Sequence, residues 1–167
     1  MTLYWTGIRI GELLALTPKD IDILKKTISI TKSYQRLDGR DIITPPKTPK
    51  SIRIIAIPEF LAADLQDYIN GLYEPQEEER LFKVTKHYFE KEIKRGIRAS
   101  GIKKIRIHDL RHSHCALLIE MGSAPLEIAE RLGHERVETT MNTYGHLYPN
   151  KQRQLSNKLE LAYREDL

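Results

Sequence analysis

The chain has 167 residues, which is the size of one domain, and 40% of them are hydrophobic, which is enough for a packed core. Charged residues make up 30% with a net charge of +4, so the composition is unlike that of a disordered chain. The single cysteine excludes an internal disulfide, and no apolar run approaches the roughly 18 residues of a membrane span. With no signal peptide visible, we expect a cytoplasmic protein.

The N-terminal third predicts one helix followed by short strands. Apolar residues recur at helical spacing over residues 3–16, and Pro18 ends the run. Residues 27–31, 42–44 and 51–57 read as strands, the first and last by alternating apolar and polar side chains. A turn is expected at the Asp-Gly of residues 37–40. These segments predict a small three-stranded antiparallel sheet with a lysine-bearing turn at its edge.

The remaining two thirds predict helices. Apolar stripes, proline starts and glycine ends mark them. The expected helices are 59–72, 86–99, 108–121, 125–132, 137–144 and 151–163. The fold class is therefore α+β, mainly α-helical, with helices packed on a small antiparallel sheet.

Positive charge is concentrated in one segment. Residues 85–111 hold nine Lys and Arg against three acids, whereas acids collect at residues 74–79. A molecule with one basic side suits a polyanion partner, although a solvated helix face produces such runs at least as often.

Several side chains could carry chemistry. His108 and Arg111 are three residues apart, so on a helix they share a face and both could contact one phosphate. His134 follows a glycine at a helix end, and Tyr144 lies at helical spacing from Val137 and Met141. Taken singly, these residues are as well explained by a surface pair, a helix-end histidine and a core tyrosine.

A metal site is the weaker alternative. His108 and His112 have the four-residue spacing of zinc ligands, with His114 nearby. The acid of a His-Glu-x-x-His hydrolase is missing, no cysteine pair exists, and His112 and His114 point in different directions on a helix. We expect no metal and no other cofactor.

Considered together, the motifs resemble the catalytic domain of the tyrosine recombinases, with most similarity to integrases of Gram-positive mobile elements. The resemblance rests on residues 6–13 (TGIRIGEL), a lysine on a strand turn, residues 108–112 (HDLRH), residues 132–134 (LGH) and residues 143–146 (TYGH), in that order. It covers nearly the whole chain.

The resemblance implies a role for each matched residue. Arg9, Arg111 and His134 would hold the scissile phosphate, His108 would be the first motif histidine and a candidate acceptor of the tyrosine proton, and Tyr144 would be the nucleophile. Lys47, followed by threonine as in the family, would protonate the leaving 5′ oxygen, and Lys50 is the alternative. Glu12 matches an acid that we interpret as structural.

The implied activity is site-specific integration or excision of a mobile element through a covalent 3′-phosphotyrosine, which conserves the bond energy and needs no ATP. The partner would be double-stranded DNA, contacted along its backbone by a set of basic side chains. That set is Lys86, Lys94, Arg95, Arg98, Lys103, Lys104 and Arg106. The resemblance also implies a tetramer on DNA with the last helix exchanged between neighbours, while packing of that helix on its own domain is the alternative.

The expected organisation is a single catalytic domain over residues 1–167, truncated at its N-terminus. Only eight residues precede Arg9, and the DNA-clamping and arm-binding domains usual in the family have no counterpart. Two other functions stay open: a non-catalytic DNA-binding fragment, and a type IB topoisomerase-like enzyme.

Overall fold

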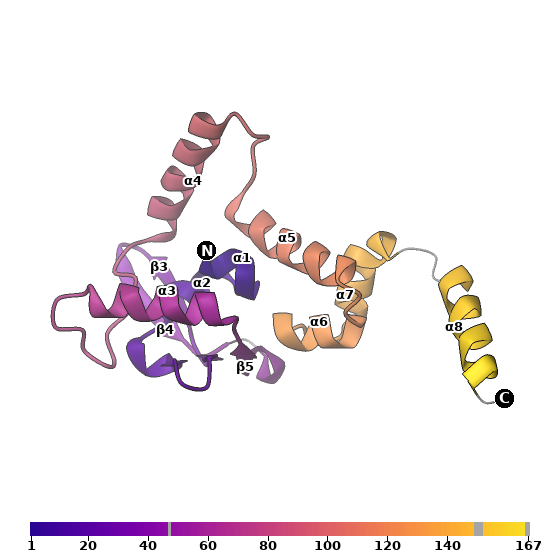
Figure 1. Cartoon of the computed structure of the whole chain (residues 1–167). Coiled ribbons are helices and arrows are strands. Elements are labelled where there is room, and N and C mark those ends of the chain that lie inside the picture. Colours follow the sequence, from indigo (N-terminus) through magenta and orange to yellow (C-terminus); the bar gives the residue numbers. More distant parts are fainter. Residues whose placement is uncertain (47, 149–151, 166–167) are drawn as a thin grey trace.

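The computed structural model describes residues 1–46, 48–148 and 152–165, with the side chains of a few residues in the last helix left out. Its fold is mainly α-helical with small antiparallel sheets, as the sequence predicts (Figure 1). Among the described residues, no helix combines the length and apolar character needed to span a bilayer.

The first predicted helix is in fact two. Helix α1 (Thr2–Thr6) ends at Gly7, whose φ of 67° is left-handed, and α2 (Ile10–Ala15) begins after Arg9. A Cβ at Gly7 would lie 2.6 Å from the His114 ring, so glycine meets both the backbone and the space requirement here. The prediction of one continuous helix over residues 3–16 is therefore wrong. The break makes Arg9 the N-cap residue of α2.

The strands form a three-stranded sheet and a separate hairpin. β1 (Ile21–Asp22), β2 (Thr27–Ile30) and β5 (Arg53–Ala56) pair antiparallel in that order. β3 (Ser33–Leu37) and β4 (Arg40–Thr44) form the hairpin around the predicted Asp-Gly turn. The expected strand 42–44 thus belongs to β4 of the hairpin, while β1 and β3, absent from the prediction, complete the two sheets.

The helices of the remainder lie close to their predicted bounds. They are α3 (Glu59–Asn70), α4 (Lys86–Ser100), α5 (Ile107–Glu120), α6 (Pro125–Leu132), α7 (Val137–Tyr144) and α8 (Gln152–Glu165). Short 3₁₀ turns span Pro18–Asp20, Pro49–Ser51 and Gly145–Leu147. Helix α4 projects from the body, and α8 lies apart from the other helices (Figure 1).

The core has two main parts. The larger part joins α1, α2, the three-stranded sheet and α3 around residues such as Ile8, Ile28 and Leu61. The smaller one lies between α5, α6 and α7 and contains Cys115 and Tyr144. Since α5 contacts both α1 and α6, it connects the two parts of the core, and some of its side chains lie at their junction.

Candidate active site and DNA-facing surface

Arg9 is held by Glu12 at the start of α2. The Arg9 backbone N–H donates to Glu12 Oε2 at 2.9 Å, and its Nη1 donates to Oε1 at 2.7 Å. The Glu12 side chain is only 3% exposed, whereas that of Arg9 is 41% exposed. Glu12 therefore fixes the direction of a guanidinium that still faces solvent.

Arg53 of β5 holds the other side of Glu12. Its Nη2 donates to Glu12 Oε2 at 2.9 Å, its Nε to the Arg131 carbonyl at 2.8 Å, and its Nη1 to the Ser51 carbonyl at 2.9 Å. Burial alone would raise the pKa of Glu12, but the hydrogen bond and charge of Arg53, with Arg9, hold that pKa below its usual value. Arg53 thus ties α2, the end of α6 and the turn before β5 together.

Arg111 is 4% exposed and lies at the junction of the two core parts. Its Nη1 donates to the Gly7 carbonyl at 2.6 Å, and its Nη2 donates to the Leu132 carbonyl at 2.7 Å. Burial, followed by the charge of Arg9, lowers the pKa of Arg111 to about 10, so it remains cationic at neutral pH. The two carbonyls orient this buried charge between α1 and the end of α6.

His134 follows the left-handed Gly133 at the end of α6, as its sequence position predicts. Its Nδ1 shares a hydrogen bond of 2.8 Å with Thr140 Oγ1 on α7. Burial, followed by the charges of Arg111 and Arg9, lowers the pKa of His134 to about 4, so the ring is neutral at pH 7. With Nδ1 engaged, Nε2 is the ring atom left for a ligand.

Tyr144, at the end of α7, is 5% exposed and packs in the smaller core part. Its hydroxyl lies 2.6 Å from Nδ1 of His112. His108 is exposed and its ring meets that of His112 edge-on at 4.7 Å. In the described chain no hydrogen bond joins His108 to Tyr144, so His112, and not the expected His108, is the histidine in contact with the tyrosine.

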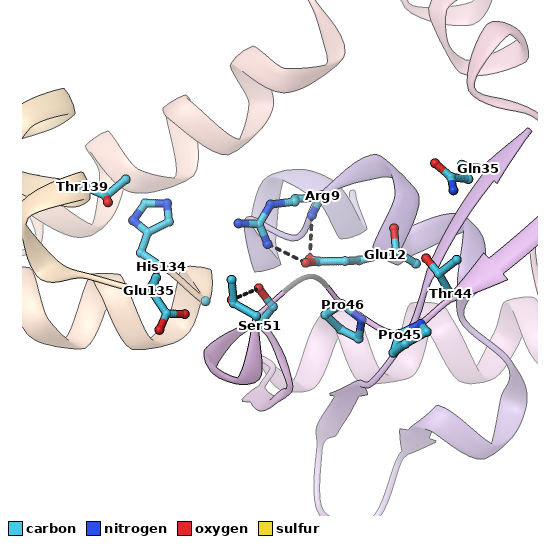
Figure 2. A pocket seen from close by; sticks show the side chains of 13 residues that line it. Arg9, Glu12, Gln35, Thr44, Pro45, Pro46, Ser51, His134, Glu135 and Thr139 are labelled. Carbon is cyan, nitrogen blue, oxygen red and sulfur yellow. Dashed lines mark hydrogen bonds and ion pairs between the residues drawn. The ribbon is translucent and has the colours of Figure 1, made fainter. Parts of the chain in front are cut away.

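Two cavities meet at Arg9. One of about 410 Å³ is lined by Arg9, Glu12 and Ser51 on one side and by His134 and Glu135 on the other (Figure 2). The other, of about 380 Å³, is lined by Arg9 together with His108 and Arg111. The fold therefore brings Arg9, His108, Arg111 and His134 to two cavities that share Arg9, although these residues are up to 125 positions apart in the sequence.

The family model described as the phage integrase family matches residues 1–151. The chain belongs to the phage integrase family of tyrosine recombinases.

Among curated relatives of this integrase-family chain, the ICEBs1 integrase of Bacillus subtilis (strain 168) is 41% identical over 94% of the chain and 46% of its own length. The integrase of Staphylococcus phage L54a is 34% identical over 93% of the chain and 49% of its own length. The chain thus spans about half the length of these relatives.

Solved structures show the same fold. The Tn1549 transposon integrase in complex with circular intermediate DNA matches with a TM-score of 0.82 and 25% identity, over 94% of this chain and 57% of that one. The catalytic domain of bacteriophage HP1 integrase matches with a TM-score of 0.61 and 23% identity, over 94% of this chain and 77% of that one.

The basic residues that the sequence points to in this integrase-family chain all lie on one projecting part of the molecule. Helix α4 and the segment leading into α5 carry them, and every one is exposed (Figure 1). Lys86, Arg95 and Arg106 form ion pairs with acids of their own segment, and their side chains nevertheless stay exposed to solvent. The other four residues of the predicted set, Lys94, Arg98, Lys103 and Lys104, are exposed as well.

Lys47, the expected catalytic lysine, lies outside the described residues, and the alternative Lys50 is exposed in the 3₁₀ turn before β5. Two residues that sequence reasoning missed are Arg53 and His112. The sequence offers only weak signals for them: position 53 is a cation on the expected strand 51–57, and His112 directly follows Arg111. Their partners, Glu12 and Tyr144, are distant in the sequence and become visible only in the structure.

A metal centre is not among the features of the described part of the chain. No group of three or more His, Cys, Asp or Glu side chains there could hold a metal ion. His114 does not join His108 and His112 in a metal-binding group. It is buried, and its Nε2 accepts a hydrogen bond of 3.0 Å from Arg131 Nε.

Proposed function

We propose that this chain is the catalytic domain of a site-specific recombinase that integrates or excises a mobile element through a covalent 3′-phosphotyrosine. The observation that carries the proposal is the convergence of Arg9, His108, Arg111 and His134 on two cavities that share Arg9, with Tyr144 in the core part between α5, α6 and α7. Family membership supports it, because the curated relatives include integrases of mobile elements and phages.

The scissile phosphate would be held by the guanidinium of Arg9, the neutral ring of His134 and the buried charge of Arg111. The transition state of phosphoryl transfer spreads negative charge over non-bridging oxygens, and fixed donors stabilise it in place of a solvent shell. Each such donor is typically worth about 2.7–4 kcal/mol. Arg9 is the accessible member, since it lines both cavities.

Tyr144 would be the nucleophile. Attack of its oxygen on phosphorus releases the 5′ oxygen and leaves the 3′ phosphate on the tyrosine. Tyr144 is 5% exposed, so the residues around it must open to admit the phosphate to its hydroxyl when DNA binds. From the sequence pattern, Lys47 would protonate the leaving 5′ oxygen, with Lys50 as the alternative.

Double-stranded DNA would lie along α4 and the segment before α5, whose exposed cations would contact the backbone. The Tn1549 transposon integrase structure is itself a complex with DNA. Self-association on DNA is supported by α8, where Leu155, Leu159, Leu161 and Tyr163 are all at least half exposed. The alternative, packing of this helix on its own domain, finds no support in these exposures.

The test is a nicked suicide duplex drawn from the DNA flanking the coding sequence, mixed with the protein and resolved in SDS. We expect a covalent protein–DNA band that Tyr144→Phe abolishes while DNA binding stays near that of the wild type. Salt-sensitive binding without a band would favour a non-catalytic DNA-binding fragment. Relaxation of supercoiled DNA without strand joining between two sites would favour a topoisomerase.

A further inference from the structure

The hydroxyl of Tyr144 has a partner that none of the roles above uses. Nδ1 of His112 lies 2.6 Å from Tyr144 Oη, and the two rings meet at 56° with their centroids 5.5 Å apart. One residue comes from α5 and the other from the last position of α7. This short contact joins two helices in a partly buried place, and it puts a ring nitrogen within hydrogen-bond distance of the tyrosine oxygen.

The tyrosine needs such a partner. Burial, with the neighbouring Cys115 next, raises the pKa of the Tyr144 phenol to about 12, although Arg111 lowers it in part. At pH 7 only about one phenol in 10⁵ with such a pKa is ionised. Attack on phosphorus therefore requires that the hydroxyl lose its proton during the step, to a group in direct contact with it.

We propose that His112 is the residue that accepts the proton of Tyr144 during strand cleavage and returns it during rejoining. The inference rests on the proposed function. As Tyr144 Oη bonds to phosphorus, its O–H bond breaks and the proton moves to His112 Nδ1. The phosphorus–O5′ bond breaks at the same time. The 5′ oxygen leaves with the electron pair and takes a proton from the general acid proposed above for the leaving group. In rejoining, a 5′ hydroxyl attacks phosphorus and returns its proton to the group that protonated the 5′ oxygen during cleavage. The bond between phosphorus and the tyrosine oxygen breaks, and that oxygen recovers its proton from His112.

The surroundings of His112 support this role. In the tautomer required, Nδ1 accepts the tyrosine hydrogen and Nε2 carries the ring hydrogen. The pKa of the Asp109 carboxyl is lowered by Arg106 first, with the charge of His112 as a smaller contribution, so a carboxylate lies within electrostatic reach of the His112 ring. His108, on the same helix, meets that ring edge-on at 4.7 Å. Burial lowers the pKa of His108, and the charge of His112 contributes.

The experiment compares His112→Asn with His112→Ala on the nicked suicide duplex. The asparagine oxygen can still accept a hydrogen bond near the position of Nδ1 but cannot take the proton, and alanine does neither. We expect both variants to form the covalent adduct at least about 100-fold more slowly than the wild type, as for loss of a general base, with DNA affinity changed less than about twofold. Asp64→Ala is the control, since that side chain is exposed on α3, outside the proposed DNA-facing surface, and should leave the rate unchanged.

A second measurement separates proton transfer from a structural role. A fluorinated tyrosine with a lower phenol pKa is placed at position 144 by amber suppression, in the wild type and in His112→Ala. We expect the more acidic nucleophile to restore much of the rate of His112→Ala and to change the wild-type rate little. A wild-type rate in His112→Ala, or no restoration by fluorotyrosine, would overturn the inference. Absence of any adduct from the wild type would instead overturn the proposed function, so the two failures are distinguishable.

Discussion

Arg53 should contribute several kilocalories to folding through its pair with Glu12. Both side chains are nearly buried, at 7% and 3% exposure, and Arg53 also donates to the carbonyls of Ser51 and Arg131. Removing one member of such a pair typically costs about 3–5 kcal/mol, because the other charge stays buried and unpaired. Arg9 would still contact Glu12, so we expect the lower end, about 3 kcal/mol, for Arg53→Met.

The assay is urea unfolding at 25 °C for the wild type, Arg53→Met, Glu12→Gln and the double variant. Glutamine removes the negative charge that Arg53 would leave unpaired, so the double variant should lose clearly less than the sum of the single losses, by about 2 kcal/mol. In heating experiments, Arg53→Met should unfold about 6–12 °C below the wild type. A loss under about 1 kcal/mol for Arg53→Met, or strictly additive losses, would refute this reasoning.

The other predictions concern a glycine, a buried histidine and the basic surface. Gly133→Ala should destabilise the protein more than Gly122→Ala: both positions have positive φ, but only at 133 would a Cβ meet a neighbour, Arg53 Nη1 at 2.8 Å. Stability should fall as the pH drops from about 6.5 to about 4, because burial lowers the pKa of His114 to about 4 and the unfolded chain binds that proton first; this change should shrink by up to about 3 kcal/mol in His114→Gln. Charge reversal of Lys103 and Lys104 should weaken DNA binding and flatten its dependence on salt.

Each has its own check. Equal free energies of unfolding for the two glycine variants would remove the steric conflict with Arg53. An unchanged acid limb in His114→Gln would assign it to other groups, of which His134 is the first candidate. For the lysines, Lys25→Glu on the turn between β1 and β2 is matched to Lys103→Glu or Lys104→Glu made singly, and an equal effect there would make the loss one of net charge alone.

Sequence pattern predicted local structure best where proline and glycine mark the ends. Helices α6 and α7 have the bounds expected from Pro125, Gly133 and Gly145. The same reasoning failed at Gly7, because apolar residues continue at helical spacing on both sides of a break that the packing of α5 and α6 imposes. β1 is only two residues long, and β3 lacks apolar alternation, so neither produces a strand signal.

In the candidate site, too, some residues could be predicted from the sequence and others could not. The motif residues were predicted from the sequence, and the fold places Arg9, His108, Arg111 and His134 at two cavities that share Arg9. What supports them was not found, because the contacts of Arg53 and His112 join positions 41 and 32 residues apart, and no local spacing encodes such contacts. Sequence reasoning made His108 a candidate acceptor of the tyrosine proton, whereas the histidine in contact with the Tyr144 hydroxyl in the structure is His112.

The most direct test of the account is to locate the attachment point in the covalent adduct. After nuclease trimming, trypsin cleavage after Arg136 and Lys151 yields one peptide that contains both Tyr144 and Tyr148. We predict that fragmentation mass spectrometry places the residual nucleotide phosphate on Tyr144. A nucleotide on Tyr148, or on any residue outside this peptide, would contradict the assignment of the nucleophile and with it the proposed function of the site.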